Sequence, residues 1–145
     1  MNLFFDTSVL VASAVRHHPP HPPAFAALTE VTSGRHRGFA AAHSLAETYA
    51  VLTRLPLDPP VHSSEAQRMI EENILAHFRL LAPSTRDYRE VVGEVATAGL
   101  TGGIVYDALI LRCAQKQPCD RIYTFNVSHF RRLAPLWEKK ICAPS

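Results

Sequence analysis

The chain lacks most of the short motifs that identify nucleotide-binding and hydrolytic folds. It has no G-x-G-x-x-G after its first apolar run and no G-K-[ST] anywhere, which argues against a Rossmann cofactor site and a P-loop. It also has no G-x-S-x-G nucleophile elbow and no H-E-x-x-H pair. Dinucleotide-dependent, nucleoside-triphosphate-dependent and serine-esterase functions therefore lose support.

Long apolar stretches and paired cysteines are missing as well. No apolar run approaches the roughly 20 residues that span a membrane, and the N-terminus reaches Asp6 without a basic segment, so we expect neither a membrane helix nor a signal peptide. The three cysteines, Cys113, Cys119 and Cys142, form no close-spaced metal pair, and their odd number favours reduced thiols. Without linkers or repeats, residues 1–145 are expected to form one domain.

Short apolar runs alternate with helical patterns along the whole chain. Strands are expected at residues 3–5, 38–41, 78–81, 121–125 and 140–142. Alternating strands and helices indicate a parallel sheet covered on both faces. The fold class is therefore predicted to be α/β, with three α/β/α layers around a central parallel sheet of four to five short strands.

Several helix boundaries are also predicted. Residues 17–23 contain four prolines and are expected to form a loop. A capping-box pattern places a helix start at Ser64, and Ser84 is expected to cap the following helix. After the glycine turn at 99–103, a helix is expected to begin at Asp107.

Three acidic residues fall at strand ends or helix starts, although the chain has only 13 Asp and Glu in 145 residues. Asp6 ends the first apolar run, and Glu47 and Asp107 lie near the starts of two helices. Parallel sheets bind ligands beyond the carboxyl ends of their strands, so these side chains are expected to converge there. Clustered carboxylates repel unless a cation lies between them, and they are typical ligands of Mg²⁺ or Mn²⁺. A metal-dependent phosphodiesterase is the first hypothesis.

Each acid taken alone also has a purely structural interpretation. Asp6 is a preferred helix N-cap residue. Glu47 completes a capping box with Ser44, and Asp107 is stabilised by the dipole of its helix. The functional hypothesis therefore depends on the three acids as a set.

Polar residues near the same edge leave two interpretations open. Asn126 follows the last main strand and could coordinate a metal through its carbonyl oxygen or serve as a turn residue. Ser8 and Thr124 could position water or phosphate, or bond only local backbone. From Arg112 onward the chain contains seven basic residues and only two acidic ones. This excess of positive charge could attract nucleic acid or simply form a solvated surface.

Four passages in a fixed order carry a resemblance to a known family. They are Phe4-Phe5-Asp6-Thr7-Ser8-Val9-Leu10, His43-Ser44-Leu45-Ala46-Glu47-Thr48-Tyr49, the segment from Gly99 to Ile110 with Thr101-Gly102-Gly103 before Asp107, and Tyr123-Thr124-Phe125-Asn126-Val127-Ser128-His129-Phe130. With these passages the chain resembles PIN-domain ribonucleases, in particular the VapC toxins of bacterial toxin–antitoxin pairs. The resemblance covers nearly the whole chain.

The resemblance implies a ligand set for the metal. Asp6, Glu47 and Asp107 fall at the positions of the acidic ligands for Mg²⁺ or Mn²⁺. Asn126 stands where many relatives carry a fourth acid, and His129 where some carry another, so the chain departs from the four-acid pattern and the second metal is in doubt.

The resemblance also implies a reaction and partners. The reaction is endonucleolytic cleavage of RNA by a metal-activated water, with Ser8, Thr124 and Asn126 orienting that water and the scissile phosphate. Arginines of the basic C-terminal third are expected to hold the RNA backbone. The family further implies a cytoplasmic homodimer silenced by a cognate antitoxin.

Two other functions compete with this hypothesis. A PIN-like module that binds RNA or protein without cutting would account for the missing fourth acid. A phosphatase with Asp6 as covalent nucleophile is disfavoured, because phosphatases of the haloacid-dehalogenase type require a second aspartate two residues later, where this chain has Ser8.

Overall fold

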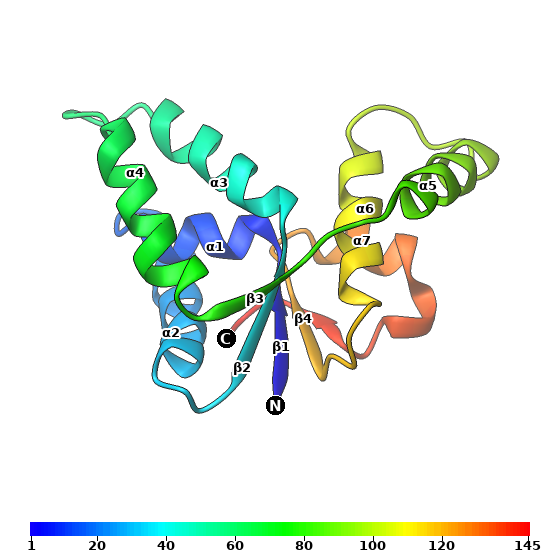
Figure 1. Cartoon of the computed structure of the whole chain (residues 1–145), viewed down its shortest axis with the longest axis horizontal. Helices are drawn as coiled ribbons and strands as arrows, with labels where there is room; N and C mark the ends of the chain where they lie inside the picture. The colour runs from blue at the N-terminus through cyan, green and yellow to red at the C-terminus, as the bar shows by residue number, and fades with distance from the viewer.

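A computed structural model describes residues 1–145 and places five short strands in one sheet, in the order β3-β2-β1-β4-β5 (Figure 1). All neighbouring strands pair in parallel. The strands are β1 (Asn2–Phe5), β2 (Arg37–Ala41), β3 (Phe78–Leu81), β4 (Arg121–Tyr123) and β5 (Ile141–Cys142). The predicted central parallel sheet is confirmed.

Seven α-helices connect the strands and cover both faces of the sheet. They are α1 (Thr7–Ala14), α2 (His21–Thr32), α3 (His43–Arg54), α4 (Ser63–Ile70), α5 (Thr85–Thr97), α6 (Ile104–Ala114) and α7 (Val127–Leu133), with a π-helical turn at Glu71–Leu75 and a 3₁₀ turn at Pro135–Trp137. Figure 1 shows α1 to α4 on one side of the strands and α5 to α7 on the other. The α/β/α layering is therefore confirmed. None of the helices is both long and apolar enough to cross a lipid bilayer.

The central strand β1 is buried on both faces because its side chains alternate between two cores. Leu3 and Phe5 pack with α1, α2 and the π-helical turn, whereas Phe4 packs with α6 and α7. The Phe5 ring makes edge-to-face contacts with Phe78 on β3, at 5.0 Å between centroids, and with Tyr123 on β4, at 5.6 Å. The end of β1 is thus held rigidly at the middle of the sheet.

The chain runs outward from β1 to β3 on one side of the sheet and returns to β4 and β5 on the other. Such a reversal between neighbouring parallel strands opens a crevice at their carboxyl ends, where ligands bind in open α/β sheets. Asp6 follows β1 at this point, and Thr124 follows β4. The topology therefore brings residues 118 positions apart to the same edge.

Two predicted boundaries near prolines and caps are wrong. Helix α2 begins at His21, so the loop expected at 17–23 ends early. Pro22 and Pro23 fit the first helical turn, because its N–H groups have no intrahelical acceptor. Helix α4 begins at Ser63, one residue before Ser64, and the ring of His62 accepts a hydrogen bond from the Ser64 N–H. The predicted cap at Ser84 is confirmed, with a full capping box to Asp87.

The predicted start of α6 at Asp107 is also wrong. The helix begins at Ile104, with Gly103 at its N-cap, so Asp107 lies within the first turn. Ile104 and Val105 pack against a small core that includes Val91 of α5, and this burial favours helix over the turn that local sequence suggests. Strand β4 likewise ends at Tyr123, two residues before the predicted end.

Candidate active site

Asp6 lies where the strand order reverses between β1 and β4, with only 2% of its surface exposed. It occupies the N-cap position of α1, but its carboxylate makes no capping hydrogen bond. Instead, Oδ2 accepts hydrogen bonds from the hydroxyls of Ser8 and Thr124, each at 2.8 Å. Burial raises the pKa of Asp6 above its usual value of 3.8, and the two hydroxyls partly offset that rise. Two hydroxyls from different segments of the chain therefore hold the carboxylate of Asp6 beyond the ends of β1 and β4.

Ser8 and Thr124 connect this carboxylate to the backbone beyond β4. The Phe125 N–H donates to Oγ of Ser8 at 3.1 Å, and the Asn126 N–H donates to Oγ1 of Thr124 at 3.0 Å. Each hydroxyl thus accepts from backbone and donates to Asp6, so the two side chains do more than bond local backbone, and their positioning of water or phosphate stays a prediction. Asn126 precedes α7 without capping it through its side chain.

Glu47 is held from α1 rather than by its own helix end. The capping box predicted with Ser44 is wrong, because α3 begins at His43 and Ser44 lies inside the helix. The hydroxyl of Thr7 lies 2.8 Å from Oγ of Ser44 and 3.1 Å from Oε1 of Glu47. The Glu47 carboxylate is therefore held by a residue of α1 and not by the N-terminus of its own helix.

Asp107 completes the set from α6. Burial is the largest cause that raises the pKa of Asp107 to about 6, and the negative charges of Asp6 and Glu47 raise it further, whereas His129 lowers it. Like charges shift a pKa in this way only at short range. The three predicted acids, together with His129, therefore share one region of the structure.

The donor set suits a hard divalent cation. No three His, Cys, Asp or Glu side chains come close enough together to enclose a metal ion by themselves. Mg²⁺ needs no such cage, since it keeps several waters and takes one or two direct carboxylates. The negative charges of Asp6 and Glu47 repel that of Asp107, and a bound cation would offset this repulsion. The chemistry of the site thus fits Mg²⁺ or Mn²⁺ better than zinc, which prefers nitrogen and sulfur ligands.

Sequence reasoning missed residues that shape the site from other elements. Thr7 positions Glu47, and the ring of His43 lies 3.7 Å from the same carboxylate. The His43 ring also stacks on Tyr106, with centroids 5.9 Å apart. The only sequence signal for these residues was their position beside Asp6, Glu47 and Asp107, which does not specify a contact between helices.

Some basic residues of the C-terminal third are already paired with acids of the chain and are less available to a ligand than the composition indicates. Arg112 forms ion pairs with Glu90 and Glu94 across the α5–α6 interface, at 2.8 and 2.7 Å, and Lys116 pairs with Asp87. These side chains therefore stabilise the fold more directly than they could serve a ligand.

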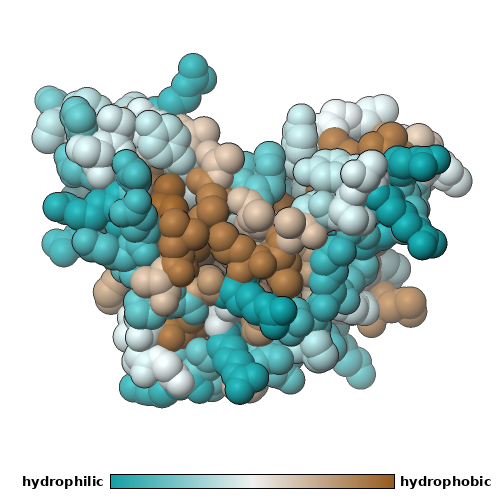
Figure 2. All heavy atoms as spheres, in the orientation of Figure 1, coloured by the Kyte–Doolittle hydropathy of each residue, from teal (hydrophilic) through white to brown (hydrophobic).

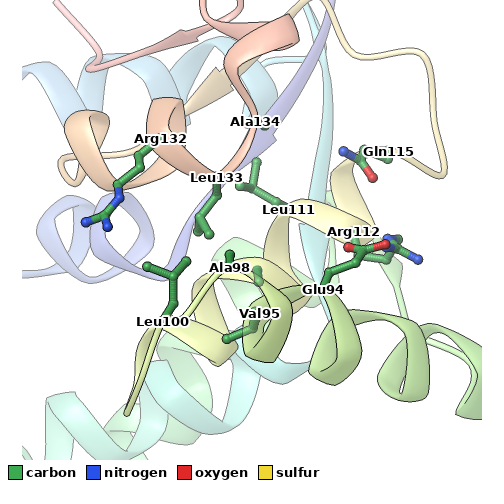
Figure 3. A pocket seen from close by; sticks show the side chains of 11 residues that line it. Glu94, Val95, Ala98, Leu100, Leu111, Arg112, Gln115, Arg132, Leu133 and Ala134 are labelled. Carbon is green, nitrogen blue, oxygen red and sulfur yellow. The ribbon is translucent and has the colours of Figure 1, made fainter.

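Two neighbouring arginines on α7 have different surroundings. The guanidinium of Arg131 donates to the carbonyl oxygen of Ile141 at 2.9 Å. Arg132 instead lines the edge of a cavity of about 160 Å³ between α5, α6 and α7, pointing away from Arg112 and Glu94 (Figure 3). Arg132 thus has no ion-pair partner in the structure and is exposed, so it remains open to a ligand.

Comparison with known proteins decides the family. The PIN domain family matches residues 3–135 of the chain. The chain belongs to the PIN-domain family. This PIN-domain chain is 37% identical to Ribonuclease VapC27 of Mycobacterium tuberculosis over 119 residues, covering 81% of the chain and 80% of that protein. It is also 37% identical to Ribonuclease VapC40 of the same species over 105 residues, 72% of each chain.

A solved structure shows the same fold. The crystal structure of VapBC2 from Rickettsia felis, bound to a DNA fragment from its promoter, superposes on this PIN domain with a TM-score of 0.69. The match covers 100% of both chains at 18% identity. At that identity the likeness extends to the fold alone.

Proposed function

We propose that this PIN-domain chain is a Mg²⁺- or Mn²⁺-dependent endoribonuclease, the VapC-like toxin of a toxin–antitoxin pair. The observation that supports the proposal is the proximity of Asp6 and Glu47 to Asp107, whose pKa is raised to about 6 by burial first and then by the negative charges of these two acids. The relatives at 37% identity are named as ribonucleases, which gives this acidic site its reaction class.

Each acidic residue has a defined role in the proposal. Asp6 and Asp107 hold the metal directly, and Glu47 holds it directly or through water. A divalent ion at such a site activates a water molecule and stabilises the leaving oxygen of a phosphodiester. The chain contributes carboxylates that are already oriented, because Ser8 and Thr124 both donate to Oδ2 of Asp6 and Thr7 donates to Oε1 of Glu47.

Asn126 and His129 are both exposed, and His129 is close enough to Asp107 to lower its pKa. Asn126 supplies a neutral oxygen that can orient water or the scissile phosphate, as can the hydroxyls of Ser8 and Thr124. With Asn126 in place of a fourth acid, Asp6, Glu47 and Asp107 would hold one metal ion tightly, and any second ion would need the RNA phosphate as an additional ligand.

The partners belong to the same proposal. The substrate is RNA, and the chain acts as a single-domain cytoplasmic homodimer that a cognate antitoxin inhibits. Figure 2 shows apolar surface gathered over the end of α4 and along β3, and Leu75 beside this region is 48% exposed. Contiguous exposed apolar surface commonly marks a protein interaction site, which suits either the second copy or the antitoxin.

The decisive experiment treats a pool of cellular RNA with wild type or Asp6→Asn, in Mg²⁺ or in EDTA. Discrete new 5′-phosphate ends are expected only with wild type and metal. Cleavage that persists in EDTA, or that Asp6→Asn retains, would contradict the proposed chemistry.

A non-catalytic RNA- or protein-binding module is the second candidate, and Asn126 is the observation that favours it. Calorimetric titration with Mn²⁺ distinguishes the two functions. A catalytic site predicts Mn²⁺ binding that Asp107→Asn abolishes, whereas a pure binding module predicts no specific Mn²⁺ heat in either protein.

A further inference from the structure

Two exposed aromatic rings form an ordered stack beside the acidic residues. The rings of Tyr106 on α6 and His43 on α3 have centroids 5.9 Å apart and planes inclined by 12°. Tyr106 leaves 53% of its surface exposed, and the His43 side chain leaves 43% exposed. The stack therefore orders two rings that burial does not hold in place.

The stack lies beside two of the three acids of the candidate site. Tyr106 immediately precedes Asp107, and Nε2 of His43 lies 3.7 Å from Oε1 of Glu47. The two rings thus connect the helices that carry two of the three acids. Figure 2 shows the surface hollowed between the part that carries α3 and the part that carries α5 and α6.

Packing alone does not explain the position of Tyr106. Its neighbours Ile104 and Val105 turn into the small core around Val91, whereas Tyr106 faces outward. An aromatic pair at this separation gains stacking energy without burying a full ring. The result is a flat apolar surface, fixed in orientation and open to solvent.

We infer that Tyr106, backed by His43, is a stacking platform for one unpaired nucleobase of the RNA, next to the phosphate at the acidic site. This inference rests on the proposed ribonuclease function. Single-stranded RNA is recognised largely by stacking of splayed bases on aromatic side chains, and every base offers such a face. A base within a duplex has both faces covered by its neighbours, so the platform selects single-stranded segments.

The first test measures binding without cleavage. Short single-stranded RNAs carrying one 2-aminopurine at successive positions are titrated with protein in EDTA, because stacking quenches 2-aminopurine fluorescence. Wild type and Tyr106→Phe are expected to quench the probe at one position, whereas Tyr106→Leu binds about 10-fold more weakly and does not quench. Tyr88→Leu is the matched control, since Tyr88 on α5 is a similarly exposed tyrosine, at 44%, that belongs to no aromatic stack in the structure.

A second arm leaves the protein unchanged. An abasic nucleotide at the quenching position is expected to weaken wild-type binding by about the same factor, with little further loss in Tyr106→Leu. Equal affinity of wild type and Tyr106→Leu for the intact RNA, or equal wild-type affinity for intact and abasic RNA, would overturn the inference.

Cleavage kinetics separate this inference from the proposed function. If wild type cuts RNA, Tyr106→Leu is expected to raise KM about 10-fold for a single-stranded substrate while kcat changes less than about 2-fold. A larger loss in kcat than in affinity would contradict a stacking role. If wild type does not cut RNA, the proposed function fails, and the fluorescence and abasic experiments still decide whether Tyr106 binds a base.

Discussion

The hydroxyl of Thr7 lies 3.1 Å from Oε1 of Glu47, so the residue that follows Asp6 in sequence holds a carboxylate of another helix. The same hydroxyl lies 2.8 Å from Oγ of Ser44, which is fully buried. Thr7 therefore fixes the orientation of Glu47 relative to Asp6. It touches neither substrate nor metal in the proposal and acts as a positioning residue.

Replacing Thr7 by valine tests this role, because valine keeps the shape and removes the hydroxyl. We expect Thr7→Val to weaken Mn²⁺ binding roughly 10-fold, as for other residues that orient metal ligands. Thr7→Ser keeps a hydroxyl and should restore most of the affinity. Calorimetry measures both, and thermal unfolding checks that each variant is folded. Wild-type Mn²⁺ affinity in Thr7→Val would show that Glu47 needs no such support.

Neutralising Asp107 should stabilise the metal-free protein. Folding raises the pKa of Asp107 from 3.8 to about 6, so the folded chain binds this proton more tightly than the unfolded chain does. Stability from this group is therefore highest below pH 4 and is lost as the pH rises towards 6. In EDTA at pH 8, Asp107→Asn should unfold at a higher temperature than wild type, and the difference should shrink at pH 4.

Added Mn²⁺ should reverse that order. Ligand binding to the folded state raises the unfolding temperature of wild type, whereas Asp107→Asn has lost a ligand and should not respond. Glu72→Gln, an exposed change without an ion-pair partner in the structure, is the control and should behave like wild type throughout. A metal-free Asp107→Asn protein less stable than wild type at pH 8 would show that burial and the neighbouring acids do not disfavour the charge of Asp107.

The sequence was sufficient for those parts of the site that follow from strand ends. The first apolar run of the sequence ends at Asp6, and this end predicted the position of Asp6 beyond strand β1. Because the sheet is parallel, the end of β4 lies at the same edge and brings Thr124 to Asp6. Contacts between helices were not predictable in this way. Periodicity shows which face of a helix is buried but not the neighbour that it meets, so the contact of Thr7 with Glu47 and the stack on Tyr106 appeared only in three dimensions.

Local signals also failed where packing overrides them. Ser44 and Glu47 have the spacing of a capping box, yet α3 begins at His43 and uses both side chains for other contacts. The roles of Ser8, Thr124 and Asn126 in catalysis stay predictions, although their bonding to Asp6 and to neighbouring backbone is now described.

Asp87 should change stability with the opposite pH dependence to Asp107. The hydrogen bond from Lys116, followed by that from the Ser84 N–H, holds the pKa of Asp87 well below its usual value. This stabilisation is present above pH 4 and is lost as the pH falls. At pH 7, Asp87→Asn should lower the midpoint of thermal unfolding by roughly 3 °C, and the gap should narrow towards pH 2. A pH-independent difference would point to a packing effect instead.

Arg132 should contribute to RNA binding, whereas Arg112 should contribute to stability. Arg132 lies one helical turn after His129 on α7, so the two side chains share a face, and His129 is close enough to Asp107 to lower its pKa. Arg112 is occupied by Glu90 and Glu94. Arg132→Ala should therefore weaken binding of single-stranded RNA and reduce the slope of log affinity against log salt by about 1.

Arg112→Ala is the matched variant for this comparison, since it removes the same charge from a neighbouring helix. It should leave the salt slope unchanged and lower the thermal midpoint, because Glu94 loses its only ion-pair partner and Glu90 loses one of two. The measurement is RNA affinity between about 50 and 200 mM salt, together with thermal unfolding. Equal salt slopes for Arg132→Ala and wild type would show that Arg132 does not contact the RNA. Other basic residues would then have to bind the phosphate backbone of the RNA.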